Sequence, residues 1–500
     1  MLNRRQWLVA GGLTLGSPFG AHAALGHPDA LYTGPFGTEP ALQPLRGWVD
    51  AQDRLAEGLR VEGRLPAALR GTLYRNGPGL LERAGQRYAH WFDGDGLVQA
   101  WHFEGAAVRH TARFVRTRKF ELEHEAGAFL LPAFGTAIPA RRPLRSSDDV
   151  NTANTGVILQ GGRLYALWEG GSAHELDPET LHTRGRKVWA PELTGMPFSA
   201  HPKREPDGTL WNFGAFMGKL ALYQIGPHGA LVRSRVLDLP VAAMVHDFVL
   251  TERFLVFVLP PLELDPQGLR EGRSLVGAMR WRAEQPNRIV VIDKSDLSVR
   301  TVLEAPPELL FHFGNAWDDG DALIRLDYVS TDHQRFLSGG FNSMLHGHRS
   351  EPFSPSNPRL VQIDLRKRRV TLASRLEQVE FPQVDPRVVG RAYRYVFYPE
   401  ARGRRWGEGA AVLRVDLQRD RTERFDFGPG VIVEEQLLVP KPGRSREGQG
   451  WLVGTGFDSR RQRSFCTVFD AEAVSAGPVA TVWLPYWAPL GFHGHFQFAA

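Results

Sequence analysis

Short hydrophobic runs, separated by polar and turn-forming residues, make up most of the chain beyond residue 60. The runs are rich in Val, Ile, Leu and aromatic residues, and Gly, Pro, Asp or Asn interrupts them roughly every eight to twelve residues. Apolar residues spaced three and four positions apart, which predict amphipathic helices, are scarce. The pattern therefore predicts an all-β chain.

The clearest predicted hairpin joins residues 156–160 to residues 163–168. Both segments are apolar, and Gly161 and Gly162 between them can adopt the positive φ that a two-residue hairpin turn requires. Further strands are predicted at residues 254–259, 288–293 and 451–456.

A long all-β chain with regularly spaced turns favours a β-propeller. No strict repeat recurs at a fixed period, so the number of blades does not follow from the pattern. Residues 260–282 and 337–358 are richer in Gly, Pro and Ser than their surroundings, and we expect them to be excursions from the blades.

Four histidines stand in separate, mostly apolar and aromatic settings: His201, His246, His312 and His493. Their intervals of 45, 66 and 181 residues fit no zinc finger or helical site, because such sites draw ligands from neighbouring turns. In a propeller the innermost strands face a common axis, so one residue from each of several blades can reach one ion. The two shorter intervals fit successive blades, the longest would skip blades, and His493 would lie on the closing blade.

Composition narrows the classes of partner. Among 500 residues, 60 basic and 55 acidic residues give a net charge of +5, and the basic residues are dispersed, so we expect no nucleic-acid partner. Cys466 is the single cysteine, which excludes an internal disulfide and a cysteine-based metal site, and we interpret it as a small buried hydrophobe.

The first 23 residues resemble an export signal of the twin-arginine type. Arg4 and Arg5 precede a short apolar run that contains glycines. Residues 21–23, Ala-His-Ala, resemble the small-residue pattern at which export signals are cleaved. No later stretch reaches the roughly 18 uninterrupted apolar residues that a spanning helix needs. We expect a signal at 1–23, one propeller domain at 24–500 and a periplasmic location; the alternative is a cytoplasmic protein with a basic N-terminus.

Several motifs in order along the chain resemble the carotenoid cleavage oxygenase family. The resemblance covers nearly all of the predicted mature chain, and no single motif is decisive. The matching segments are residues 70–79, 90–96, 113–117, 151–155, 167–171 and 484–494.

The resemblance implies a seven-bladed propeller, with loops and short helices forming a cap over one iron(II) per chain. It assigns the ligands to His201, His246, His312 and His493, and not to the nearby His495. It also implies that three glutamates orient histidine rings by accepting their second N–H. These glutamates are Glu169, Glu380 and Glu435, and Thr155 matches a position whose methyl group crowds a vacant iron site and directs oxygen.

The implied reaction is oxidative cleavage of a conjugated C=C bond of a carotenoid or apocarotenoid with O2, giving two carbonyl products. Four imidazoles by themselves could equally hold zinc or copper. Stilbenoid cleavage is the first alternative function. Stilbene-cleaving members of the family carry a tyrosine near Phe120 and a lysine further on to engage a phenol. Phe120 has no hydroxyl, and residues 129–149 contain no lysine. A propeller that only binds a ligand is the second. We expect a monomer that takes a lipophilic substrate and O2, and peripheral membrane contact stays open.

One acidic motif invites a different interpretation. Asp93-Gly94-Asp95-Gly96 could suggest a calcium loop, but the other oxygen ligands of such a loop are missing. We therefore interpret His90 and the residues after it as a structural turn.

Overall fold

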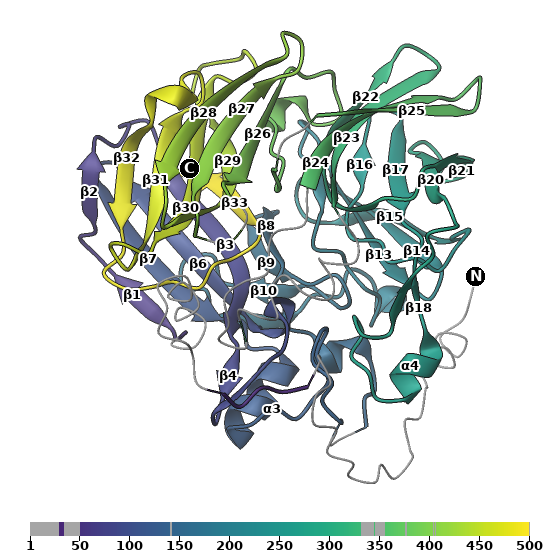
Figure 1. Cartoon of the computed structure of the whole chain (residues 1–500), viewed down its shortest axis with the longest axis horizontal. Coiled ribbons are helices and arrows are strands. Elements are labelled where there is room, and N and C mark those ends of the chain that lie inside the picture. The colour runs from purple at the N-terminus through teal and green to yellow at the C-terminus, as the bar shows by residue number, and fades with distance from the viewer. Residues whose placement is uncertain are drawn as a thin grey trace.

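Seven β-sheets surround a common axis as a seven-bladed propeller (Figure 1). The computed structural model describes residues 30–34, 51–140, 143–331, 345, 356–375, 378–403, 405 and 407–499. The predicted all-β, seven-bladed architecture is confirmed. The predicted export signal at 1–23 and most of the predicted excursion at 337–358 lie outside the described residues.

The blades follow one another along the chain, except where the ring closes. Blade one holds β1 (Arg54–Ala56), β7 (Ala107–Phe114), β6 (Asp95–Glu104), β3 (Arg70–Leu80) and β33 (Gly494–Phe498). Blade two holds β11 (Thr183–Arg186), β10 (His174–Leu176), β9 (Arg163–Leu167) and β8 (Gly156–Gln160). Blade three holds β12 (Lys203–Arg204), β13 (Leu210–Phe216), β14 (Lys219–Ile225) and β15 (Leu231–Asp238).

The remaining blades have the same antiparallel plan. Blade four holds β16 (Val249–Leu250), β17 (Phe254–Leu259), β20 (Asn287–Asp293) and β21 (Val299–Ala305). Blade five holds β22 (Leu309–Asp319), β23 (Leu323–Thr331), β24 (Ser356–Asp364) and β25 (Arg369–Ser374). Blade six holds β26 (Tyr395–Ala401), β27 (Ala410–Asp416) and β28 (Arg421–Gly428). Blade seven holds β2 (Arg60–Gly63), β32 (Pro478–Trp483), β31 (Arg463–Asp470), β30 (Gly450–Asp458) and β29 (Val431–Pro440).

Two strand pairings close the ring. In blade one, β33 pairs antiparallel with β3, so that Gly494 lies opposite Arg75. In blade seven, β2 pairs antiparallel with β32. Segments from opposite ends of the described chain therefore complete each other's sheets.

Blade six has an irregular innermost segment in place of a fourth regular strand. Residues 379–383 run beside β26 through isolated bridges from Val379 to Glu400 and from Gln383 to Phe397. This segment places Glu380 at the axis.

The core lies between neighbouring blades. All six residues of β17 are buried, as expected for a continuous apolar run covered on both faces. One apolar cluster joins Val256 and Ile289 of blade four to Phe313 and Ile324 of blade five. In the predicted hairpin of blade two, Gly161 and Gly162 have φ values of +58° and +76°. The blades thus pack face to face and hold the inner strands in fixed positions around the axis.

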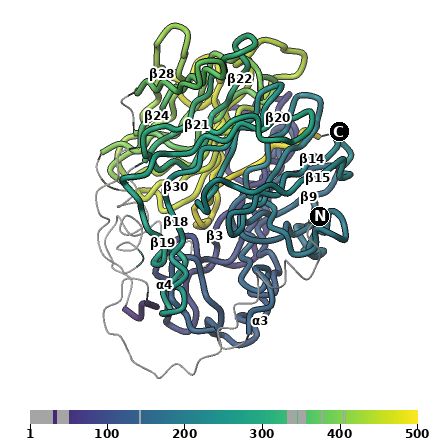
Figure 2. Tube along the Cα trace, turned by 90° about the vertical axis from the view of Figure 1, so that its right-hand side faces the viewer, coloured from purple at the N-terminus to yellow at the C-terminus, as the bar shows by residue number. Residues whose placement is uncertain are grey.

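Short helices and loops cover one end of the propeller, where α3, α4 and β18 gather (Figure 2). The predicted excursion at 260–282 contains a short helix and a two-stranded sheet and packs beside Phe311, next to His312. The short elements outside the blades are β4 (Glu82–Arg83), β5 (Gln86–Arg87), η2 (Trp91–Asp93), α3 (Arg118–Ala126), η3 (Ser147–Val150), η4 (Pro191–Leu193), β18 (Leu262–Leu264), α4 (Pro266–Arg270), β19 (Met279–Trp281), η5 (Pro386–Val388) and η6 (Val474–Ala476).

Candidate metal centre

The four predicted ligands stand at the starts of the innermost strands of four blades. His201 and His246 precede β12 and β16, His312 lies near the start of β22, and His493 comes directly before β33. These strands belong to blades three, four, five and one. Because each inner strand begins at the same end of the axis, the sequence intervals of the histidines reflect blade lengths.

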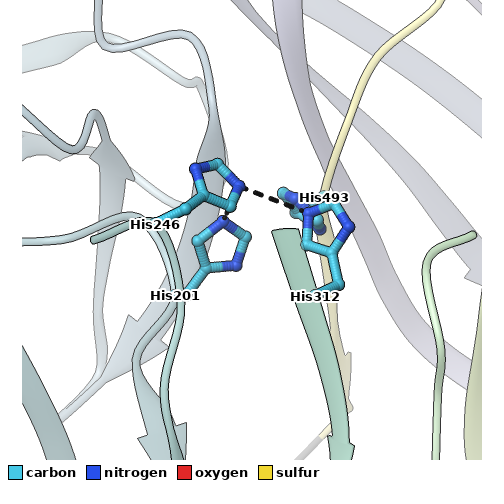
Figure 3. Close-up of side chains that lie close together, drawn as sticks. All are labelled: His201, His246, His312 and His493. Atoms are coloured by element: carbon cyan, nitrogen blue, oxygen red, sulfur yellow. Dashed lines mark hydrogen bonds between the residues drawn. The ribbon is translucent and has the colours of Figure 1, made fainter. Parts of the chain in front are cut away.

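The four rings converge on one point (Figure 3). Their candidate ligand nitrogens all lie within 4.8 Å of one another. Nε2 of His246 lies 2.9 Å from Nε2 of His201 and 3.4 Å from Nε2 of His312. His495 does not belong to this group, as predicted.

Each of the three predicted glutamates accepts a hydrogen bond from the second ring nitrogen of one ligand. The Nδ1-to-carboxylate distances are 2.7 Å for His246 and Glu169, 2.6 Å for His312 and Glu380, and 2.9 Å for His493 and Glu435. Glu169 follows β9 of blade two, and Glu380 and Glu435 lie in blades six and seven. Every blade therefore contributes one residue, either a histidine or a glutamate.

In three of the four rings, those of His246, His312 and His493, the hydrogen bond to a carboxylate defines which nitrogen is free to bind a metal. A ring that donates Nδ1–H to a carboxylate has its lone pair on Nε2 when neutral. Nε2 of His246 faces Nε2 of His201 at 2.9 Å, and a cation between the two nitrogens would be bound by both lone pairs. The donor set therefore fits one divalent transition-metal ion, and His201, His246, His312 and His493 would hold it.

Burial favours the neutral form of two of the four histidines. Desolvation and the neighbouring imidazoles hold the pKa of His201 well below its usual range. Burial also lowers the pKa of His493 to about 4, although Glu435 acts in the opposite direction. For His312 burial lowers the pKa, but the charge and hydrogen bond of Glu380 outweigh it and leave the pKa raised. Neutral imidazoles at His201 and His493 are ready to bind a metal without first losing a proton.

The three glutamates differ in their surroundings. The side chains of Glu169 and Glu380 are 23% and 27% exposed, whereas that of Glu435 is 2% exposed. Besides His493, Glu435 accepts hydrogen bonds from Gln383, Arg75 and the backbone N–H of Gly494. Burial raises the pKa of Glu435, but His493 and Arg75 outweigh this effect and lower it, so the carboxylate stays charged.

A cavity of about 240 Å³ opens beside the ligands. Among the described residues that line it there is no Lys, Arg or Tyr, while aromatic rings supply much of the wall. These rings belong to Trp91, Phe92, Phe134, Trp168, Phe311, Phe381 and Phe492. Such a lining favours an apolar molecule.

Thr155 lines this cavity and is tied to a metal ligand. Its carbonyl accepts the backbone N–H of His493 at 3.3 Å, and its hydroxyl donates to Oδ1 of Asn154 at 3.0 Å. The Asn154 amide in turn donates to the carbonyls of Phe92 and Gly94. The Thr155 hydroxyl is therefore engaged by Asn154, and the role of its methyl group in directing oxygen stays a prediction.

The motif after His90 is a structural turn, as predicted. The His90 ring accepts the backbone N–H of Phe92 and caps η2. The Asp93 carboxylate accepts hydrogen bonds from the backbone N–H of Gly135 and from the Thr136 hydroxyl. This turn fixes Trp91 and Phe92 in the cavity wall.

Sequence reasoning gave no role to Arg75 or Gln383, both of which bind Glu435. Arg75 lies in one of the family-like motifs, but nothing in that motif indicates a partner 360 residues away. The family resemblance suggested that Phe120 lies near a phenol-binding position. Its ring instead stacks on Phe114 and His124, and Phe120 is not among the residues lining the cavity. Its lack of a hydroxyl therefore carries no weight against a phenolic substrate.

The fold and the site together define a propeller metalloprotein with a four-histidine centre. Residues 49–497 match the sequence profile of the family described as retinal pigment epithelial membrane protein. The chain thus belongs to the retinal pigment epithelial membrane protein and carotenoid cleavage oxygenase family, whose members are non-haem iron oxygenases that cleave double bonds.

Characterised relatives act on different substrates. The apocarotenoid-15,15'-oxygenase of Synechocystis sp. is 32% identical over 463 residues, which cover 87% of this chain and 91% of the relative. The lignostilbene-alpha,beta-dioxygenase isozyme III of Sphingomonas paucimobilis is 29% identical, with 93% and 97% covered. The isoeugenol monooxygenase of Pseudomonas putida is 28% identical, with 88% and 94% covered.

Solved structures agree with this assignment. A variant of Synechocystis apocarotenoid oxygenase superposes with a TM-score of 0.83 at 29% identity, covering 93% of this chain and all of the other. The cobalt-substituted form of that enzyme superposes with a TM-score of 0.82 at 29% identity, with the same coverage. The comparisons therefore show the family, and the four convergent histidines fit its metal site.

Proposed function

We propose that the protein is an iron(II) dioxygenase that cleaves one conjugated C=C bond of a carotenoid or apocarotenoid. Both atoms of O2 enter the products, so that one C=C and one O2 give two C=O groups. The observation that carries the proposal is an aromatic cavity of about 240 Å³ whose lining includes His246, His312 and His493, three of the four convergent imidazoles.

The protein's own residues supply binding, orientation and exclusion of water. When bound, iron(II) supplies the redox chemistry that activates O2. Trp91, Phe92 and Phe492 form contiguous aromatic contacts that can hold a planar polyene next to the ligands. No general base is required, because no proton is removed from the substrate in this balance. The Thr155 methyl group would narrow the space beside the metal and so direct O2 toward one side.

The alternative is cleavage of a stilbenoid, which the similarity to lignostilbene dioxygenase supports. Against it stands the cavity lining, whose described residues offer no Lys or Arg to pair with a phenolate. A third reading, a propeller that only binds a ligand, is disfavoured by the complete set of buried polar partners, which would be costly to retain without use.

Incubation of iron-loaded protein with matched apocarotenals, carotenoids and hydroxystilbenes tests the proposal. We expect two carbonyl fragments from an apocarotenal or a carotenoid, each carrying one labelled oxygen after reaction under ¹⁸O2, as measured by mass spectrometry with rapid trapping of the aldehydes. Products from hydroxystilbenes alone would favour the alternative. Absence of products and of oxygen uptake with every substrate would favour the binding module.

We further propose that the protein is a periplasmic monomer that receives a lipophilic substrate; the twin-arginine-type sequence at 1–23 supports the location, and the aromatic cavity supports the substrate class. None of the helices in the described part of the chain is long and apolar enough to cross a membrane. Fractionation of cells expressing the full chain, compared with the Arg4→Lys/Arg5→Lys variant, tests the location, and a periplasmic pool that the variant does not lose would contradict this export route. Cosedimentation with lipid vesicles tests peripheral contact.

A further inference from the structure

Arg75 is a buried arginine of blade one that contacts Glu435 of blade seven beside the metal centre. It lies on β3 of blade one, and its side chain is 1% exposed. Nη1 donates to Oε2 of Glu435 at 2.8 Å, and Nη2 donates to the carbonyl of Phe492 at 3.0 Å. The guanidinium therefore holds both the carboxylate that orients His493 and the residue immediately before His493.

Glu435 differs from the other two glutamates because an arginine side chain pairs with its carboxylate. Among the described residues, Glu169 and Glu380 form ion pairs with their histidines and with no Lys or Arg. Glu435 has a fixed cation at 2.8 Å, and the same cation lies 3.7 Å from the neighbouring Glu434. Buried charges interact through a low effective dielectric, so a cation in this position strongly offsets the field of the carboxylates.

We propose that Arg75 is a positioning residue that sets the charge, and thereby the redox potential, of the metal centre. It lets Glu435 orient His493 while cancelling most of the negative charge that Glu435 would otherwise place behind the ring. Without this cation the site would gain one net negative charge, which stabilises an iron(III) ion more than an iron(II) ion. Arg75 therefore keeps the metal in the divalent state that the proposed function requires.

The test is a redox titration of the iron-loaded protein with ferricyanide, in which each ferricyanide takes one electron from iron(II) and yields iron(III) and ferrocyanide. The iron(III) signal in electron paramagnetic resonance reports the extent of oxidation. We expect R75Q to have a lower midpoint potential than the wild type and to oxidise in air on the order of tenfold faster, as for a barrier change of about 1.4 kcal/mol. An unchanged or raised potential would overturn the proposal.

Three further variants separate the effect of charge from that of packing. E435Q, which removes the opposite charge and keeps the shape, should raise the potential, and R75Q/E435Q should return it close to the wild-type value. R75K should keep a potential close to that of the wild type. A purely structural role predicts shifts of the same sign for R75Q and E435Q, and that outcome would overturn the proposal. If R75Q does not fold, E435Q decides alone, because an unchanged or lowered potential contradicts the charge argument.

The proposal rests on the proposed function for the identity of the metal, but its readout does not involve substrate. A protein that binds iron and cleaves no polyene would contradict the proposed function and leave the titration interpretable. Shifts of the expected signs in such a protein would still support the role of Arg75.

Discussion

His201 is the ligand with no carboxylate partner among the described residues, and its ring is held by other means. Its backbone N–H donates to the Ser199 hydroxyl, and its ring packs 4.4 Å from that of His246 and 4.5 Å from that of His493. The other three ligands each have an anionic partner, which makes a ring nitrogen more basic. We therefore expect the four metal–nitrogen bonds to be unequal, with His201 the weakest donor.

The carboxylate partners should contribute measurably to metal affinity. In E380Q an amide replaces the anion that orients His312, so affinity for iron(II) should fall by about 10- to 100-fold. The measurement is competition with a coloured chelator, and E304Q, a change at an exposed surface glutamate, serves as the control. Equal affinities for E380Q and E304Q would show that the hydrogen bond does not tune the site.

The two halves of the Thr155 side chain can be tested separately. T155S keeps the hydroxyl that Asn154 accepts and loses the methyl group, whereas T155V keeps the methyl surface and loses the hydroxyl. If the methyl group directs O2, T155S should lower the product formed per O2 consumed severalfold, and T155V should not. An oxygen electrode with parallel product analysis measures this ratio; equal ratios for both variants would remove the methyl group from the mechanism.

At the residue scale the sequence predicted the ligands and the glutamates through their motifs, but it did not predict their pairing. His246 and Glu169 are 77 residues apart, and His312 and Glu380 are 68 residues apart. Such pairings depend on which blades face each other across the axis, and no local pattern contains that information. The contact between Arg75 and Glu435 was missed for the same reason.

Among the secondary-structure elements, β33 has two roles, since it completes blade one and is preceded directly by His493. The segment just before β33 approaches β3 closely: a Cβ atom on Gly77 of β3 would lie 2.3 Å from Cα of Gly491. Glycine at position 77 therefore allows the segment that carries His493 to pack against blade one.

Replacing Gly77 should disturb both the fold and the metal. G77A forces Gly491 to move, and we expect a loss of about 1–3 kcal/mol in the free energy of unfolding, together with weaker iron binding. Urea denaturation with iron analysis measures both quantities. G226A, where the added Cβ atom would meet no atom closer than 3.6 Å, is the matched control. Unchanged iron affinity in G77A would show that the packing of this segment does not position His493.

Truncation after Pro489 removes β33 together with the fourth ligand. We expect loss of bound iron and a lower melting temperature, because the inner edge of β3 becomes unpaired. H493A is the comparison, since it should lose iron while keeping the strand. Iron that persists in the truncated protein would place the fourth ligand elsewhere.

Regular strands were predictable from the sequence, and irregular ones were not. The hairpin of β8 and β9 followed from two apolar runs around two glycines, and β17 matches the predicted run at 254–259. The inner segment of blade six at 379–383 makes only isolated bridges. Its function is to place Glu380, and a strand pattern that short has no recognisable period.

On the scale of the whole molecule, the propeller forms the metal site from one residue of each blade. Four blades contribute histidines and three contribute glutamates around one axis. Periodicity in the sequence predicted the all-β class, but the number of blades came from the family resemblance, because the blades share no strict repeat. The ring itself depends on pairings between segments about 400 residues apart, which a local pattern cannot reveal.

Iron should bind the folded propeller and not the unfolded chain, and should therefore stabilise the fold. Excess iron(II) under anaerobic conditions should raise the melting temperature of the wild-type protein, since a ligand that binds only the native state adds its binding free energy to stability. H246A should remain folded, retain no iron and show no such rise. Calorimetry with metal analysis measures both, and normal iron content in H246A would remove that residue from the site.

The strand pairing that closes the ring also sets when the metal can bind during folding. Before β33 docks onto β3, only His201, His246 and His312 have successive blades to hold them, and the fourth imidazole is missing. Closing a loop of this length is an entropically costly and late event in folding. We therefore expect full affinity for the ion only once the ring has closed, so that an incompletely folded chain would hold a redox-active metal weakly.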